Sequence, residues 1–267
     1  MKSEYRAALH WVVAFCFLTT SPAIYARSLF IEELTWQEVR AELADGKTTA
    51  IIFAGSTEQN GPQMALGKHN FIARYLAEQI ALNLGDALIY PIFPYAPTGD
   101  PITRSGHMRF PGTVNVSEAV YAAVVGDVAL SAIAAGFRRI LLMGDHGDGQ
   151  AALGELARAM DAQLAPRGIR VLHITAVFDP PGFSLTAPGR IVPLDLQAHA
   201  GTLDTATLMA IDHDGRWVRR DQFANANATN GAEEDPRNAT AELGQKALAQ
   251  RVAAALTQIR ALTLAQP

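Results

Sequence analysis

Histidines and carboxylates gather in four glycine-rich segments of this 267-residue chain. The segments are Gly55–Pro62 followed by His69, Arg104–Thr113, Gly144–Gly149 and His199–Thr205. Imidazole and carboxylate groups bind zinc-like ions, and imidazoles also exchange protons near neutral pH. Four of the six histidines that follow residue 26 lie in these segments, each with a carboxylate or an arginine nearby. The pattern therefore favours a metal-dependent enzyme over a binding or structural protein.

Two of the segments pair candidate ligands at short spacing. Glu58 precedes His69 by eleven residues, so one turn supplies a carboxylate and an imidazole. His146 and Asp148 are two residues apart after a buried strand, which lets both side chains point the same way. Simpler interpretations stay open, because Glu58 can be a solvated turn acid and His69 can cap the helix that follows it.

Other polar residues carry weaker signals. Arg104 is either a solvated loop cation or an anion-binding group, and loop arginines are more often the former. His173 stands inside an apolar strand pattern, which is typical of a core histidine with a satisfied hydrogen bond. We therefore assign His173 no catalytic or ligand role.

The segments lie between alternating strand and helix patterns. Apolar strand patterns cover 48–55, 87–91, 139–143 and 171–177, and helical patterns cover 70–84, 116–135, 151–164, 202–211 and 239–262. The polar stretch 221–236 is a connection within one domain, because the helix after it is needed to cover a sheet. The sequence predicts one layered α/β domain with a mostly parallel central sheet flanked by helices. In such folds ligands bind at the carboxyl ends of the strands.

Composition excludes several classes of protein. Apolar residues make up 49% of the chain and charged residues 18%, which excludes intrinsic disorder. The formal net charge of −4 provides no basic surface for nucleic acid, so a small molecule is the expected partner.

Residues 1–26 resemble a signal peptide. Lys2 and Arg6 precede a short apolar run, and small residues near Ala26 offer a cleavage site. The run is too short to span a bilayer, although a buried N-terminal helix is an alternative. The single cysteine, Cys16, lies in this segment, so the mature chain would have no thiol. We predict a periplasmic or secreted protein without a membrane anchor after cleavage, its single domain covering 27–267.

The segments together resemble the creatininase family of metal-dependent amidohydrolases. Gly55–His69 is similar in length and frame to that family's first motif, Gly-Ser-x-Glu-Gln-His-Gly-Pro-His-Leu-Pro-Leu-x-Thr-Asp. His107 with Phe110–Thr113 resembles its His-x-x-Phe-Pro-Gly-Thr, and His199–Thr205 resembles its His-Ala-Gly-x-x-Glu-Thr. Asp235–Gly244 is similar to its late Gly-Asp-Pro motif. The resemblance implies a layered α/β fold, a divalent-metal site, cleavage of small amides or cyclic amides, and a homo-oligomer, often a hexamer.

The departures from the family pattern fall on the ligands. Asn60 replaces a histidine, and His69 replaces an aspartate that bridges two metals. An imidazole nitrogen has one lone pair and cannot bridge two ions, and a neutral amide is a weak ligand for zinc-like metals. The resemblance then implies one metal position, held by Glu58, His69 and His146. Asp148 would be a fourth ligand or a hydrogen-bond partner of the ligands. We expect one divalent ion, zinc, with manganese or iron as alternatives.

The remaining roles follow from the same resemblance. His199 is the candidate general acid or base, and Asp204 orients it or only caps the following helix. Asn60, His107 and Arg104 are candidate substrate-binding residues. We expect a hydrolase in which metal-activated water cleaves the carbon–nitrogen bond of a small, cyclic amide. A lactonase or ester hydrolase is the first alternative, and a small-molecule binding protein without catalysis is the second.

Overall fold

A four-stranded parallel sheet forms the centre of the computed structural model, which describes residues 27–185 and 195–264. The segment with the predicted signal peptide lies outside the described residues. The strands are β1 (Thr49–Ala54), β2 (Ala87–Ile89), β3 (Arg139–Gly144) and β4 (Arg170–His173). Their order is β2-β1-β3-β4, and every neighbouring pair is parallel. The predicted layered α/β fold is therefore confirmed.

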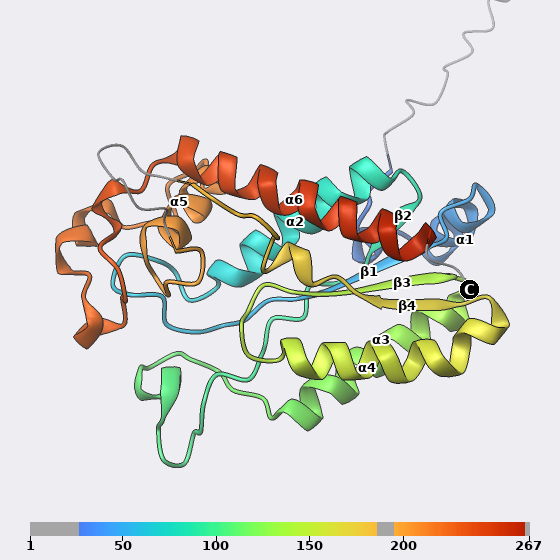
Figure 1. Cartoon of the computed structure of the whole chain (residues 1–267), viewed down its shortest axis with the longest axis horizontal. Helices are drawn as coiled ribbons and strands as arrows, with labels where there is room; N and C mark the ends of the chain where they lie inside the picture. Colours follow the sequence, from blue (N-terminus) through green and yellow to red (C-terminus); the bar gives the residue numbers. More distant parts are fainter. Residues whose placement is uncertain (1–26, 186–194, 265–267) are drawn as a thin grey trace, which may run out of the picture.

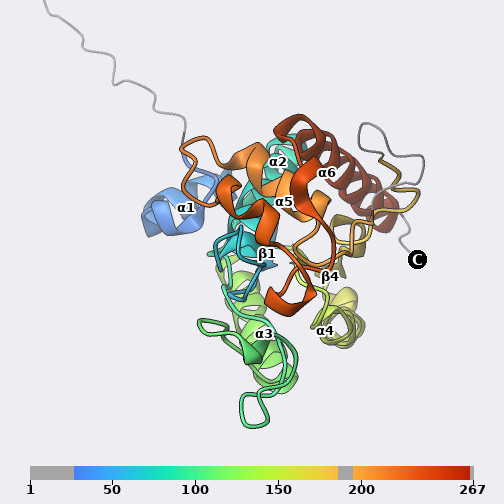
Figure 2. The same cartoon turned by 90° about the vertical axis from the view of Figure 1, so that its left-hand side faces the viewer.

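Helices cover both faces of the sheet. They are α1 (Trp36–Ala44), α2 (Lys68–Leu84), α3 (Glu118–Ala135), α4 (Gln150–Leu164), α5 (Thr202–Ile211) and α6 (Ala241–Leu264). Figures 1 and 2 show α2 and α6 above the sheet and α3 and α4 below it. Helix α5 packs against α6 at the end of the molecule where the long loops gather.

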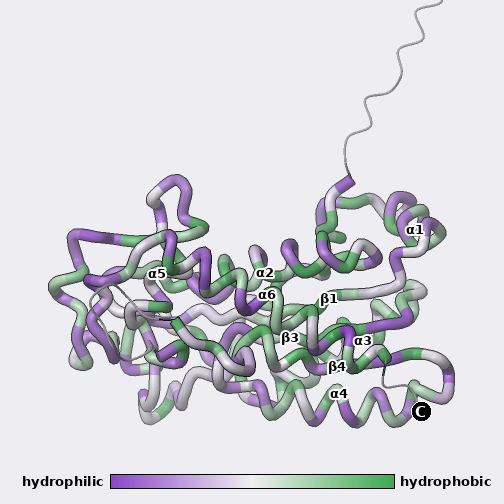
Figure 3. The backbone as a smooth tube through the Cα atoms, turned by 45° about the horizontal axis from the view of Figure 1, so that its top comes forward, coloured by the Kyte–Doolittle hydropathy of each residue, from purple (hydrophilic) through white to green (hydrophobic). Residues whose placement is uncertain are grey.

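The alternation of side chains along β1 fills two cores. Ile51 and Phe53 pack into the core under α2 and α6, whereas Ala50 and Ile52 pack into the core over α3 and α4. All six residues of β1 are buried, as expected for a parallel strand covered on both faces. Figure 3 shows hydrophobic segments along the central strands and more hydrophilic ones along the outer loops.

Two predicted strands are shorter than their apolar patterns. The pattern 87–91 forms β2 only as far as Ile89. Residues 171–177 were expected to form a strand, but β4 ends at His173 and Thr175–Val177 form a 3₁₀ turn. Side chains of α6 bind the backbone of this turn: Arg251 Nε donates to the carbonyl of Val177 at 2.6 Å, and Gln258 Oε1 accepts from the amide of Ala176 at 2.8 Å. These contacts replace the pairing that a longer strand would make.

Helix α3 is the one described helix whose length and composition would allow it to cross a membrane. Its inner face packs Tyr121, Val125 and Ala129 into the core beside the sheet, as a core helix does. Its outer face leaves Val120 and Leu130 about half exposed. The helix therefore carries an apolar outer surface in addition to its core face.

Candidate metal centre

The candidate site lies where β1 and β3 end. Glu58 follows β1, Asp145 and His146 follow β3 directly, and His69 is in the first turn of α2. The turn after β1 requires glycine, because a Cβ at Gly55 would lie 2.9 Å from the Cα of the residue after His69. The missing side chain lets α2 begin against the strand end, which brings His69 close to Glu58.

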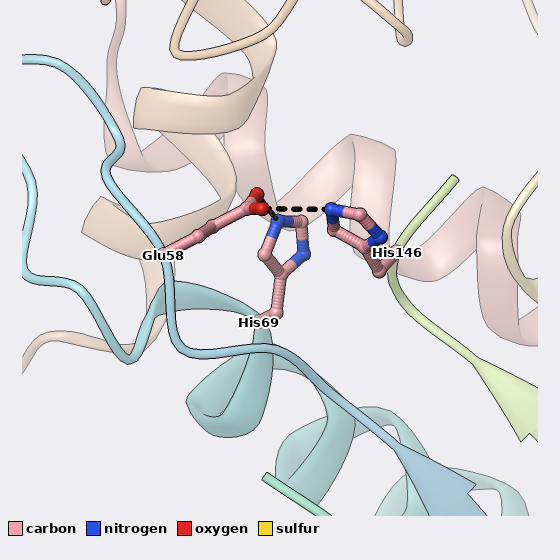
Figure 4. Close-up of side chains that lie close together, drawn as sticks. All are labelled: Glu58, His69 and His146. Atoms are coloured by element: carbon pink, nitrogen blue, oxygen red, sulfur yellow. Dashed lines mark hydrogen bonds and ion pairs between the residues drawn. The ribbon is translucent and has the colours of Figure 1, made fainter. Parts of the chain in front are cut away.

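The carboxylate of Glu58 lies between two imidazoles (Figure 4). Its Oε1 is 2.8 Å from Nε2 of His69, and its Oε2 is 2.7 Å from Nε2 of His146. Glu58 has no exposed surface. Burial opposes its ionisation, but the contacts with His146 and His69 outweigh burial and lower the pKa of the carboxyl. The predicted ligands Glu58, His69 and His146 are thus brought together, with their ligand atoms within 4.8 Å of one another.

The outer nitrogen of each of these imidazoles faces an oxygen that can only accept. Nδ1 of His69 is 2.8 Å from Oδ2 of Asp145, and Nδ1 of His146 is 3.2 Å from the carbonyl oxygen of Asp148. The outer acceptors favour a proton on each Nδ1. The two Nε2 atoms face the Glu58 carboxylate. Burial opposes protonation of His69, but its hydrogen bonds with Asp145 and Glu58 outweigh burial and raise the pKa of this imidazole. A divalent ion would take the place of the protons that the Nε2 atoms share with the carboxylate. One carboxylate and two imidazoles oriented by outer acceptors fit a divalent ion.

Asp145 is held ionised although it is buried. Burial raises its pKa, but the guanidinium of Arg251 and the hydrogen bond from His69 lower it to about 2. Arg251 is itself buried and donates to Oδ1 of Asp145. The sequence analysis missed both residues. Asp145 carried a visible signal, a carboxylate directly after a buried strand, whereas Arg251 lies within a long helix and carried none.

Two more imidazoles lie close to the Glu58 carboxylate. Nε2 of His107 is 4.0 Å from Oε2 of Glu58, and Nδ1 of His199 is 3.8 Å from Oε1. Their spacing with Glu58 would also allow a metal ion. Burial lowers the pKa of both histidines, and burial with the nearby Lys68 cation lowers that of His199 to about 3. Both imidazoles are therefore neutral near pH 7.

Asp204 contacts the turn that carries His199. Its Oδ2 accepts from the backbone amide of Ala200 at 2.9 Å and binds Nζ of Lys68 at 2.5 Å. Ala200 has a φ of 53°, a left-handed conformation that is strained for a residue with a Cβ. Asp204 therefore stabilises the backbone beside His199. Lys68, which has 1% exposure, was not identified from the sequence.

Three other predicted residues lie apart from the ligand atoms. Asp148 is exposed, and the contact it makes with His146 uses its main-chain oxygen. The amide of Asn60 is buried and donates to the carbonyl of Glu58 at 2.9 Å, within its own loop. Arg104 is exposed on a loop. The described residues that line the cavity at the site include His107 and Asp148 but neither Asn60 nor Arg104.

The cavity is small and mostly polar in its lining. Its volume is about 210 Å³, and its wall includes Lys68, Phe178, Leu196 and Arg251 besides the histidines. Ligand pockets for drug-sized molecules are larger than this, roughly 300–1,000 Å³. The space therefore suits a small molecule.

The amino-acid sequence is similar to those of known hydrolases. The family model for creatininase, described as creatinine amidohydrolase, matches residues 32–259. A creatinine amidohydrolase from Pseudomonas putida is 25% identical over 195 residues, which cover 71% of this chain and 74% of that protein. A 3-dehydro-scyllo-inosose hydrolase from Thermotoga maritima is 30% identical over 120 residues, covering 45% of this chain but only 36% of that protein.

Solved creatininase structures share the fold. A tryptophan-to-phenylalanine mutant creatininase has a TM-score of 0.71 at 23% identity and covers 87% of this chain and 98% of its own. A glutamate-to-glutamine mutant of the Zn-Zn type has a TM-score of 0.68 at 24% identity, covering 88% and 98%. A structure titled creatininase Mn has a TM-score of 0.67 at 23% identity, with the same coverage. Related proteins thus bind zinc or manganese.

Proposed function

Because the chain belongs to the creatininase family of metal-dependent hydrolases, we propose that it cleaves a carbon–nitrogen bond of a small, cyclic amide. The observation that carries the proposal is the buried carboxylate of Glu58 between the Nε2 atoms of His69 and His146. A divalent ion bound there would supply a Lewis acid for the substrate carbonyl and a water of lowered pKa. The small cavity beside these ligands supports a small substrate.

We propose that the site holds one divalent ion, with zinc as its metal. Lys68 pairs with Asp204 and Arg251 pairs with Asp145, so with the carboxylate of Glu58 these five side chains carry one net negative charge. One divalent ion would change this net charge from −1 to +1, whereas a second would bring it to +3, a large uncompensated positive charge in a buried site. One carboxylate with two imidazoles is a ligand set that zinc uses in hydrolases.

We propose that the proton for the leaving atom comes through Nδ1 of His199. This nitrogen faces the Glu58 side of the cavity at 3.8 Å from Oε1. The imidazole is neutral near pH 7 and can donate a hydrogen bond to developing negative charge in a buried site. The proton that it passes on would be replaced by the one that the attacking water loses. Asp204 supports this role through the Ala200 turn.

Metal analysis combined with a substrate screen tests the proposal. Zinc-loaded protein should contain about one ion per chain and should open cyclic amides more efficiently than lactones of the same ring size. His146→Ala is the matched control, because it removes one ligand and should abolish both zinc and turnover. Efficient opening of lactones alone would favour the ester-hydrolase alternative. Lactones are included in the screen because the name of one relative, 3-dehydro-scyllo-inosose hydrolase, does not specify an amide substrate. Protein that binds no metal but retains a small molecule would instead be a binding protein.

We also propose that residues 1–26 direct export and are removed after Ala26. The charged start, apolar middle and small-residue end of this segment support the proposal. N-terminal sequencing of protein from a periplasmic fraction should give Arg27 as the first residue. Intact Met1 on cytosolic protein would contradict it.

We further propose a homo-oligomer. The outer face of α3, where Val120 and Leu130 remain 51% and 53% exposed, is an apolar surface suited to a second copy of this chain. Light scattering should report a multiple of the chain mass for wild type and a smaller particle for Val120→Glu with Leu130→Glu. A monomeric wild-type protein would contradict the proposal.

A further inference from the structure

The side-chain amide of Gln59 contacts both His107 and His199. Its Nε2 is 2.8 Å from Nδ1 of His107 and 2.8 Å from Nε2 of His199. Its Oε1 accepts from the backbone amide of Gly61 at 2.9 Å. Gln59 therefore bridges two imidazoles that come from segments far apart in the chain.

The orientation of this amide is fixed by its surroundings. The Gly61 N–H can only donate, so Oε1 of Gln59 must face it and the NH₂ group must face the histidines. Gly231 provides the space, because a Cβ there would lie 2.0 Å from Oε1 and 2.6 Å from Cδ of Gln59. A flipped amide would place its NH₂ against the N–H of Gly61, which is unfavourable.

The fixed amide determines which nitrogen of each imidazole is protonated. An amide N–H only donates, so Nδ1 of His107 and Nε2 of His199 accept, and the protons sit on the opposite nitrogens. The carbonyl oxygen of Gln59 also lies 3.0 Å from Nε2 of His199. A proton on that nitrogen, however, would meet the closer amide N–H of Gln59. The protonated nitrogens are therefore those that face Glu58, 4.0 Å away for His107 and 3.8 Å for His199.

The outer partners thus sort the four histidines into two pairs. His69 and His146 have outer acceptors, so their inner nitrogens carry lone pairs and can bind a metal. His107 and His199 have an outer donor, so their inner nitrogens carry hydrogens and cannot. We propose that Gln59 is a positioning residue that keeps His107 and His199 as N–H donors for a substrate oxygen and prevents a second metal from binding between them and Glu58. The substrate half of this inference rests on the proposed function, whereas the tautomers and the metal count do not.

Gln59→Glu replaces the N–H donor beside His107 and His199 by a carboxylate acceptor of almost the same shape. One carboxylate oxygen can still accept from Gly61, while the other accepts from His107 and His199 and turns their lone pairs toward Glu58. We expect zinc titrations to give about one ion per chain for wild type and about two for Gln59→Glu. Adding His107→Ala to Gln59→Glu should return the count to about one. A wild-type count of two that His107→Ala reduces to one would overturn the proposal, as would a count of one in Gln59→Glu.

The tautomers can be measured on the wild type, so the test does not depend on the variant folding. Long-range ¹H–¹⁵N spectra of the zinc-loaded protein, assigned with His107→Gln and His199→Gln, should show the proton on Nε2 of His107 and on Nδ1 of His199. Protons on Nδ1 of His107 and Nε2 of His199 would overturn the assignment.

Gln59→Met tests the catalytic consequence. It should keep one zinc and the wild-type fold by circular dichroism while turnover falls by about 10- to 100-fold, the range for losing a residue that orients an active-site imidazole. Unchanged turnover would remove the donor role of the pair. If wild type cleaves no substrate but shows the expected tautomers, the proposed function fails and the assignment of ligands stands.

Discussion

Oδ2 of Asp145 accepts from Nδ1 of His69 at 2.8 Å, and this contact decides which nitrogen of His69 is free for a metal. Arg251 binds the other oxygen of Asp145, so the carboxylate stays ionised in a buried position. A permanently ionised acceptor fixes the proton on Nδ1 and raises the basicity of Nε2. The metal affinity of the site therefore depends on two residues that are not ligands.

Asp145→Asn should weaken zinc binding by about 10- to 100-fold, the range for losing a partner of a ligating histidine. The amide removes the negative charge and can place a donor against Nδ1 of His69. Competition with a chelator of known affinity measures the change. Asp148→Asn is the matched control, because the contact of Asp148 with His146 uses its main-chain carbonyl. A comparable loss of zinc in Asp148→Asn would show that its carboxylate is a ligand, as the sequence predicted.

Much of the site was predictable because its signals are local. Glu58, His69 and His146 stand in glycine-rich turns beside buried strands, and parallel strands bring their carboxyl ends to one edge of the sheet. The same locality predicted the strands and the helices α2 to α6 to within a few residues, but α1 (Trp36–Ala44) was not predicted. The predicted end of this strand, residue 177, was wrong because side chains of the distant helix α6 bind the backbone after β4.

The residues that were missed act through contacts between distant segments. Arg251 meets Asp145 across 106 positions, Lys68 meets Asp204 across 136, and Gln59 meets His199 across 140. A lysine in the first turn of a helix is ordinarily solvated, and the ion pair with Asp204 makes the burial of Lys68 tolerable. The outer partners that determine the tautomers of the histidines were therefore invisible to motif spacing.

Lys68→Met should destabilise the protein by about 3 kcal/mol, the low end for breaking a buried ion pair. The low end applies because the Asp204 side chain keeps 19% exposure. Urea unfolding followed by circular dichroism measures the loss, and Lys68→Met with Asp204→Asn should recover part of it. Arg74→Met on the same helix breaks exposed pairs with Glu32 and Glu33, which solvent screens, and should cost much less. Equal losses in the two single variants would contradict a special role for the buried pair.

His173 should make the folded state lose stability in mild acid. Burial and the nearby Arg158 lower its pKa to about 4, below the value of about 6.5 expected in the unfolded chain. Between these values the unfolded state binds more protons, so the free energy of unfolding falls as pH falls from about 6.5 to 4.

His173→Gln removes this titration, so its unfolding free energy should decline less steeply over the same range. Urea unfolding of both zinc-loaded proteins at several pH values measures the two slopes. Identical slopes would show that His173 titrates alike in the folded and unfolded states. The side chain donates to Oε1 of Gln150 at 3.0 Å, so the expected hydrogen bond is present, although His173 is partly buried rather than in the core.

His199→Ala should separate metal binding from turnover. The imidazole faces Glu58 with its Nδ1 at 3.8 Å, and in the tautomer inferred above that nitrogen carries a proton and cannot be a ligand. We therefore expect the variant to retain one zinc while turnover falls by roughly 10² to 10⁴, the range for removing a group that transfers a proton. His146→Ala, whose Nε2 lies 2.7 Å from Glu58, should instead lose zinc and turnover together. Loss of zinc in His199→Ala would make His199 a ligand, and unchanged turnover with full zinc would assign proton transfer to another group of the cavity, with Asp148 or Asp204 the next residues to substitute.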